Sequence, residues 1–203
     1  MAQRVGTRSS GGVRQALLRA ADEMLEREGL DAVTLRGLAA AAGVSRTAPY
    51  RHFSDKEELL ASVAAEGMRT LREAMTRAAE GAAREGPRAR IGTVADAYVE
   101  AALARPAHYR LIFGAELSGR AHPGLIAEAS AAFGLLAGLV REAQAARSEG
   151  PDSPVLAAGL LLSAVHGLVD LTLSGHGSAV KGLADPRAVV RLAVAQAWPP
   201  EAG

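Results

Sequence analysis

The segment from Thr34 to Lys56 most constrains the fold of this 203-residue chain, and it reads TLRGLAAAAGVSRTAPYRHFSDK. Thr34 can cap a helix whose apolar residues recur at helical spacing, namely Leu35, Leu38, Ala39 and Ala42. We expect Gly43 to end this helix, because glycine adopts the left-handed conformation without a side-chain clash. Ser45 then suits the N-cap of a second helix. The segment therefore predicts two short helices that cross steeply at a glycine.

The second predicted helix is too polar to be a core element, and it suits the major groove of DNA. Arginine donates a fork of hydrogen bonds to guanine and threonine contacts the methyl group of thymine, so Arg46 and Thr47 suit base contacts. Tyr50, His52 and Lys56 suit phosphate groups, which fix the position of a protein on DNA. These features predict a helix-turn-helix DNA reader.

Pro49 conflicts with this second helix. Proline has no backbone N–H, and its ring clashes with the carbonyl group four residues earlier, here that of Ser45. Because Ser45 is the expected cap, the conflict falls in the first turn. We expect a short, distorted recognition helix of about two turns that includes Arg51. Ser54 and Glu57 have the spacing of a capping box, which predicts that the next helix starts at Ser54.

Composition limits the classes of protein that remain. The chain has no cysteine, which excludes disulfides and thiol catalysis and fits a reducing cytoplasm. A net charge of +1 means that affinity for DNA must come from local clusters of positive charge. Residues 1–12 are small, polar and basic, so we expect a flexible arm rather than a signal peptide.

Apolar periodicity and glycine or proline breaks predict an all-α protein, since residues that favour strands are too few. The expected helices span about residues 13–28, 54–81, 89–104, 106–113, 124–148, 155–174 and 186–198. The helix at 155–174 is long enough for a membrane span, but it contains His166 and Asp170 and lacks basic or aromatic anchors at its ends. We therefore expect it to pack within its own domain and against a second subunit, and we expect no membrane contact.

His166 and Asp170 lie one helical turn apart, and several roles fit them. They suit a structural hydrogen bond, a polar contact to a ligand, or a metal site, although two residues are too few for a metal. Motifs of phosphate-binding loops, zinc helices and nucleophile elbows are absent, so we predict no catalytic residue, metal or cofactor. A helical enzyme that uses His166 and Asp170 is one alternative. An adaptor that binds partner proteins rather than DNA is another.

Aromatic and other apolar residues beyond the DNA reader can line a cavity for a small apolar molecule. Core packing is the alternative for each of them. The predicted ligand-binding residues are Met68, Leu71, Tyr98, Tyr109, Phe113, Phe133, His166 and Asp170.

The continuous stretch from Val33 to Leu60, VTLRGLAAAAGVSRTAPYRHFSDKEELL, resembles the DNA-binding domain of the TetR family of bacterial repressors. The resemblance implies phosphate contacts from Thr34, Tyr50, His52 and Lys56, and base contacts from Arg36, Arg46 and Thr47. In this family a larger aliphatic residue is commoner at the position of Pro49. Downstream, RPAHYRLIFGAEL (Arg105 to Leu117) and AVHGL (Ala164 to Leu168) resemble a subgroup named for a Trp-His-Gly motif, with Val165 in place of the tryptophan.

The resemblance also implies a fold of about nine helices, in which the last two helices of each subunit form a four-helix dimer interface. Here these are the helices at about 155–174 and 186–198. We expect a flexible arm at 1–12, a helix-turn-helix DNA-binding domain at 13–60, and a helical ligand-binding and dimerisation domain at 61–203. The expected function is that of a ligand-responsive repressor that binds an inverted-repeat DNA operator as a homodimer.

Overall fold

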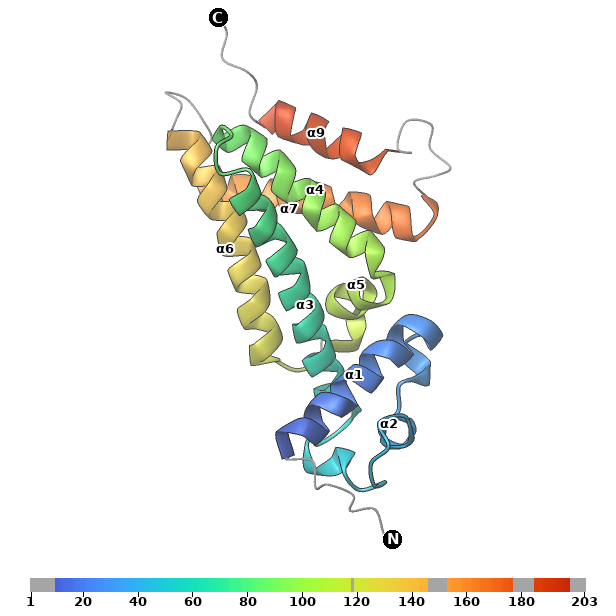
Figure 1. The fold of residues 1–203 in the computed structure, drawn as a ribbon. Helices are drawn as coiled ribbons and strands as arrows, with labels where there is room; N and C mark the ends of the chain where they lie inside the picture. The colour runs from blue at the N-terminus through green and yellow to red at the C-terminus, as the bar shows by residue number, and fades with distance from the viewer. Residues whose placement is uncertain (1–9, 118, 146–152, 177–184, 198–203) are drawn as a thin grey trace, which may run out of the picture. The chain divides into compact units, whose positions relative to one another are not determined.

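The computed structural model describes residues 10–117, 119–145, 153–176 and 185–197, and this part of the chain is helical without strands. Its α-helices are α1 (Ser10–Glu28), α2 (Leu35–Ala41), α3 (Lys56–Gly81), α4 (Pro87–Ala104), α5 (Pro106–Phe113), α6 (Pro123–Ala145), α7 (Pro154–Leu173) and α9 (Pro186–Ala197) (Figure 1). Single 3-10 turns are η1 (Leu30–Ala32), η2 (Pro49–Arg51) and η3 (Ala115–Leu117). The all-α prediction is confirmed, and the described residues contain eight of the nine or so α-helices expected. Residues 1–9 of the predicted arm lie outside the described residues, and α1 begins at Ser10 rather than Val13.

The chain divides into two compact units. The head unit contains Met1–Gly67 and Ala107–Ile126, and the C-terminal unit contains Met68–Pro106 and Ala127–Gly203. Helix α3 passes from the first unit into the second between Gly67 and Met68. Helix α5 and the segment after it therefore belong with the reader helices, although they lie far from them in the sequence.

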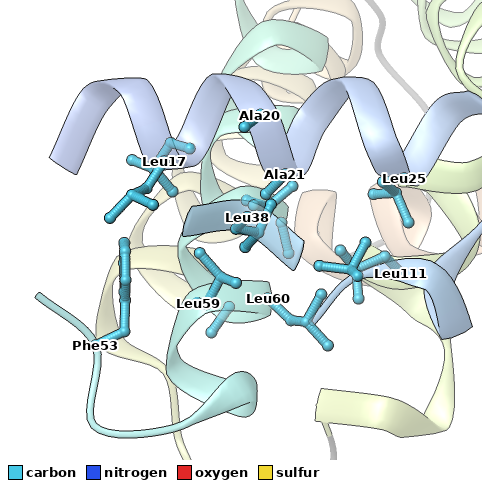
Figure 2. Close-up of a cluster of buried hydrophobic side chains, with 14 of the residues drawn as sticks. Leu17, Ala20, Ala21, Leu25, Leu38, Phe53, Leu59, Leu60 and Leu111 are labelled. Atoms are coloured by element: carbon cyan, nitrogen blue, oxygen red, sulfur yellow. The ribbon is translucent and has the colours of Figure 1, made fainter. Parts of the chain in front are cut away.

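One apolar cluster holds the head unit together. Leu25 of α1, Leu38 of α2 and Leu60 of α3 are buried in it, and so is Phe53. Leu111 of α5 points into the same cluster (Figure 2). Each of these side chains contributes roughly 1.5–3 kcal/mol by leaving water, so the cluster is the main source of stability in the head unit.

The C-terminal unit is helical and has its own apolar core. Helix α9 packs against α4 and α7, and α4 also packs against α7. Helices α3 and α6 lie side by side (Figure 1), and Arg72 donates to Glu128 across them at 2.7 Å. The side chains buried in this unit include Ile91, Val94, Leu136, Val140, Leu161 and Val169.

Gly43 ends α2 in the left-handed conformation that the sequence predicts, with φ of +63°. Its N–H donates to the carbonyl of Ala40 at 3.2 Å, and the N–H of Val44 donates to Ala39 at 3.0 Å. These two bonds form a Schellman motif, which satisfies carbonyl groups at the end of the helix. The turn between the two reader elements therefore depends on a residue without a side chain.

We predict that Gly43→Ala lowers the free energy of unfolding by about 1–2 kcal/mol, because an L-residue is strained at this φ. A Cβ at Gly43 would meet no atom within 4 Å, so the loss would come from the backbone alone. Urea denaturation of the full chain measures it. Gly11→Ala in α1 is the matched control, since its Cβ also meets nothing within 4 Å and its φ is not positive. Equal stability of the two variants would contradict the prediction.

Candidate nucleic-acid interface and ligand domain

Thr34 caps α2 as the sequence predicts. Its hydroxyl oxygen accepts a hydrogen bond from the N–H of Gly37 at 3.1 Å, and its own backbone is extended. A Cβ at Gly37 would lie 2.9 Å from this oxygen, so a side chain there would displace the cap. Because the bond uses a lone pair, the O–H of Thr34 can still donate to a phosphate. Sequence reasoning did not single out Gly37.

The prediction of a recognition helix of about two turns is wrong in both the length and the type of helix. Only a single 3-10 turn, η2, forms between Ser45 and Phe53. The carbonyl of Ser45 would need an N–H from Pro49, which proline lacks, and instead accepts from Ala48 at 2.9 Å. The chain therefore tightens to a bond between residues three apart, which is the 3-10 pattern.

Buried anchors hold this turn in place. Pro49 is buried, and the Phe53 side chain is 1% exposed in the core of the head unit. The N–H of Phe53 donates to the carbonyl of Pro49 at 2.9 Å. The guanidinium of Arg14 lies 5.2 Å from the centre of the Phe53 ring. Burial of a phenylalanine is worth roughly 1.5–3 kcal/mol, more than the 0.5–1.5 kcal/mol of one missing hydrogen bond, so the turn stays packed.

The residues between these anchors face solvent. The exposed reader residues are Thr34, Arg36, Ser45, Arg46, Thr47, Tyr50 and Arg51, while His52 and Lys56 are half-buried. Tyr50 exposes 60% of its surface, a large value for an aromatic residue. The Lys56 ammonium donates to the carbonyl of Leu30 at 3.3 Å, so one of its three N–H bonds is used within the head unit.

The cap of α3 lies one residue later than predicted. Asp55, rather than Ser54, accepts from a helix amide, the N–H of Glu58 at 2.8 Å. Glu58, rather than Glu57, reaches back and accepts from the N–H of Ser54 at 2.7 Å. These backbone hydrogen bonds lower the pKa of both carboxyl groups, and Arg120 lowers that of Asp55 further. The prediction of a capping box formed by Ser54 and Glu57 is therefore wrong.

Two residues that sequence reasoning missed fasten the segment before α6 to this cap. Arg120 donates through two nitrogens to Asp55, at 3.1 and 2.9 Å, and its third nitrogen lies 3.3 Å from Glu57. The His122 ring lies 3.0 Å from the same Glu57 oxygen. No sequence signal could have found these pairs, because their partners lie 65 residues away.

In the C-terminal unit, His166 contacts a tyrosine. The Tyr98 hydroxyl and the His166 Nδ1 atom are 3.2 Å apart, and the two rings meet edge to face. Burial lowers the pKa of His166, and the charge of Asp170 opposes this effect. Asp170 itself is exposed. The neutral form of His166 is thus favoured, and it can exchange one hydrogen bond with Tyr98.

A cavity of about 20 Å³ lies beside Tyr98. It is lined by Met75, Val94, Ala95, Tyr98, Leu136, Leu161, Leu162 and Val165. This volume holds little more than one water molecule, whereas drug-sized ligands occupy about 300–1,000 Å³. The cavity walls come from α3, α4, α6 and α7.

The other predicted ligand-binding residues are spread over both units. Tyr109 and Phe113 belong to the head unit and contact each other, with ring centres 4.9 Å apart. Met68 and Leu71 are buried on α3, and Phe133 is half-buried on α6. Of the eight residues, Tyr98 is the one that lines the cavity.

A wider groove of about 520 Å³ lies between α4 and α9. Asp96 lines it, and one of its carboxylate oxygens is buried without a hydrogen-bond partner in the described part of the chain. Burial raises the pKa of Asp96, while the charges of Arg191 and Arg187 oppose this effect. Sequence reasoning overlooked Asp96 because no local pattern marks it.

Helices α6 and α7 are long and apolar enough to cross a membrane by length and composition alone. Core helices of soluble proteins pass the same test. Exposed apolar residues of α7 include Val155, Leu156, Leu160 and Leu171.

Comparisons with known families match both parts of the chain. Residues 17–63 match the family described as bacterial regulatory proteins, tetR family. Residues 91–197 match the family described as tetracyclin repressor-like, C-terminal domain. A search of curated proteins found no match.

Solved structures are similar over nearly the whole chain. A protein of unknown function from Rhodococcus sp. RHA1 is 34% identical, with a TM-score of 0.81 and 97% of each chain covered. A TetR family transcriptional regulator from Thermus thermophilus is 19% identical, with a TM-score of 0.65 and coverage of 92% of this chain and 99% of that one. A TetR family transcription regulator from Marinobacter aquaeolei is 21% identical, with a TM-score of 0.63 and coverage of 92% and 93%. The last two show similarity of fold.

We predict that Asp96→Asn raises the melting temperature by about 1–3 °C at pH 7. The raised pKa means that the folded protein disfavours the carboxylate, so ionisation costs stability as the pH rises above the carboxyl range. The gain is small because solvent and two arginines stabilise the charge. Thermal unfolding at pH 7 and at pH 4 measures it, and the gain should shrink at pH 4. Glu100→Gln, an exposed position on the same helix, should give no gain.

Proposed function

Because this chain belongs to the TetR family of bacterial regulatory proteins, a family of DNA-binding transcription regulators, we propose that it is a ligand-responsive repressor and binds an inverted-repeat operator as a homodimer. The observation that carries the proposal is the exposed polar turn at residues 45–51, which buried Pro49 and Phe53 hold beside α2. A turn this short reads few base pairs, so two copies on an inverted repeat supply the specificity. We assign DNA binding to residues 13–60, and ligand binding and dimerisation to 61–203.

The reader residues divide by chemistry. We assign base contacts to Arg36, Arg46 and Thr47, and phosphate contacts to Thr34, Tyr50, His52 and Lys56. Ser45 and Arg51 complete the exposed surface of the turn. Arg36, Arg46 and Thr47 are all exposed, as contact with a base edge requires.

The exposed apolar face of α7 supports a dimer. Leu156 and Leu160 are 74% and 69% exposed, although they are among the largest apolar residues of the helix. A Cβ at Gly159 or Gly167 would meet no atom within 4 Å, so packing within the described part of the chain does not explain these glycines. A helix of a second copy explains both features, because small residues permit close helix approach and leucines bury their surface. The proposed interface is α7 together with α9, on which Leu192 is also exposed.

A second copy fits this face better than lipid does. Ser163 and Asp170 are exposed and interrupt the apolar surface of α7, and polar groups of this kind are costly in a bilayer. We therefore propose that the protein acts in the cytoplasm, where its DNA target lies. Asp170 is exposed on α7 and can hydrogen-bond to the second copy.

The small cavity suggests how a ligand can act. A cavity of about 20 Å³ must expand to admit an apolar molecule, so α3, α4, α6 and α7 must separate. Helix α3 continues into the head unit, which couples this separation to the spacing of the two heads. The ligand acts only through its preference for one spacing, and DNA must weaken ligand binding by the same factor.

Selection of bound sequences from random DNA tests the proposal. We expect an inverted repeat with half-sites about 34 Å apart or a multiple of this distance. Affinity should fall by about 10³–10⁵ between 50 and 200 mM salt if the dimer makes roughly 6–10 phosphate contacts. An enzyme that uses His166 and Asp170, or an adaptor, would select no DNA sequence.

Arg46→Ala and Tyr50→Phe should have different effects on DNA binding. We predict that Arg46→Ala costs about 1–3 kcal/mol on the selected operator and relaxes the preference for one base pair. Tyr50→Phe removes one hydroxyl, so it should weaken binding to all sequences by one common factor of roughly 10-fold. Titration of selected and mutated operators measures both variants. The same loss of discrimination in both would contradict the division of roles.

Leu160→Glu should convert the dimer to a monomer, because a charge would replace an apolar contact at the centre of the α7 interface. Sedimentation velocity measures the change. Ile126→Glu is the matched control, since Ile126 is an exposed apolar residue at 53% on the first turns of α6. The Ile126→Glu variant should remain a dimer. A dimer in both variants would place the interface elsewhere.

A further inference from the structure

The groove between α4 and α9 has the size of a small-molecule site, and its lining residues all belong to the C-terminal unit. Its volume of about 520 Å³ falls within the roughly 300–1,000 Å³ of drug-sized sites. Helix α9 packs against α4 here (Figure 1). The groove shares no lining residue with the cavity beside Tyr98. It is lined by Glu85, Arg88, Ala89, Gly92, Thr93, Asp96, Arg191, Val194 and Ala195.

Gly92 keeps the α4 side of this groove open. It lies in the middle of α4, and a Cβ there would meet no atom within 4 Å. Its φ is not in the positive range, so the backbone conformation does not require glycine. Glycine within a helix lowers stability relative to alanine, and close packing among the described residues does not account for it here. Any larger side chain at this position would occupy the groove instead.

Asp96 is an unused hydrogen-bond acceptor in the groove. Its side chain has no hydrogen bond in the described part of the chain, and one carboxylate oxygen is buried. The two arginines that act on its charge are paired with other carboxylates. Arg191 pairs with Asp185 at 3.3 Å, and Arg187 pairs with Glu100. A carboxylate removed from water without a partner is costly, so Asp96 suits an N–H donor brought by a ligand.

The other end of the groove suits an anion. Helix α4 begins there, and its N-cap Gly86 has no side chain to accept from the N–H groups of the first turn. These N–H groups carry the positive end of the helix dipole. Arg88 lines the same end and has no ion pair among the described residues. Glu85 lines it too, but this residue is exposed, so solvent screens its charge.

The spacing of these two ends fits one extended molecule. Arg88 and Asp96 are eight residues apart on α4, which corresponds to about 12 Å along the helix axis. The residues that line the groove between and opposite them are small or apolar, apart from Thr93: Ala89, Gly92, Val194 and Ala195. A chain of methylene groups can bury its surface against them.

We propose that this groove binds a small amphoteric molecule of the ω-amino carboxylate class, with its ammonium group at Asp96 and its carboxylate at Arg88 and the first turn of α4. Such a molecule satisfies both ends, whereas a simple amine leaves Arg88 unpaired and a simple carboxylate leaves Asp96 unpaired. Because it touches both α4 and α9, it stabilises the packing of α9 within the C-terminal unit. The site is independent of the proposed DNA binding.

Isothermal titration calorimetry of the full-length protein with 8-aminooctanoate tests the site. Octylamine and octanoate have the same chain length but one charged group each. We expect both to bind at least about tenfold more weakly, because each lacks one charge-assisted contact. Equal affinity for all three would indicate apolar binding alone and would overturn the proposal. Absence of binding would mean that the groove holds only water, with the same consequence.

Two variants test the two ends separately. Asp96→Asn keeps the size of the side chain and removes its charge, so it should weaken 8-aminooctanoate at least about tenfold and leave octanoate unchanged. Loss of binding would not reflect unfolding, because we expect this variant to be slightly more stable than the unmodified protein. Arg88→Gln should weaken octanoate and leave octylamine unchanged. Glu80→Gln, which changes an exposed carboxylate of α3 outside the groove, should affect none of them. Unchanged binding in Asp96→Asn would overturn the assignment.

Substitutions of Gly92 test whether the ligand occupies the groove. Gly92→Leu should abolish binding by filling the space, whereas Gly92→Ala adds one methyl group that meets no atom and should retain it. Amide hydrogen exchange of α9 should become slower with 8-aminooctanoate in the unmodified protein and in Gly92→Ala, but not in Gly92→Leu. Unmodified affinity in Gly92→Leu would place the ligand elsewhere and overturn the proposal. These measurements require no DNA, so failure of the proposed function would leave their outcome decisive.

Discussion

Burial of one apolar cluster in the head unit is the interaction that holds α2 and the η2 turn in place. The η2 turn has only three residues and cannot be stable alone, because a short helix gains too few hydrogen bonds for the backbone order that it requires. Pro49 and Phe53 hold it from within the protein, and Leu38 fixes the preceding helix to the same core. The polar residues between the anchors therefore face solvent and do not contribute to the core.

Charged contacts around this cluster fix which segments lie against each other, because hydrogen bonds and ion pairs are directional and apolar burial is not. Arg120 fixes the segment before α6 to the cap of α3, and His108 fixes α5 to α1. Both contacts join segments that are far apart in the sequence, and they explain why residues 107–126 belong to the head unit. The head unit thus contains more than the reader helices and the start of α3.

The C-terminal unit contains features that packing among its described residues leaves unexplained. Gly159 and Gly167 have open space where a side chain would lie, next to leucines that remain exposed. Beside Tyr98, in contrast, the cavity is too small for most ligands. The proposed dimer would cover the exposed leucines and the open space at the glycines. In the proposed ligand response, an apolar molecule would have to enlarge the cavity, and this enlargement would shift the helices that line it.

The amino-acid sequence by itself determined the features that depend on local interactions. The helices, the Thr34 cap and the left-handed Gly43 follow from periodicity, side-chain capping and backbone sterics, which act over a few residues. Pro49 predicted a distorted helix, and its missing N–H explains the 3-10 bond that forms instead, while burial of Phe53 holds the turn in place.

The tertiary structure alone decided which of the possible helix caps forms and which charged side chains pair. Ser54 with Glu57 and Asp55 with Glu58 both suit a cap for α3. The structure uses the second pair, and Arg120 and His122, 65 residues away, bind Asp55 and Glu57. His108 likewise meets Glu26 across 82 residues, and the unpartnered oxygen of Asp96 arises where α4 faces α9. No local pattern encodes such pairs, because a charged side chain finds its partner only after apolar burial has brought distant segments together.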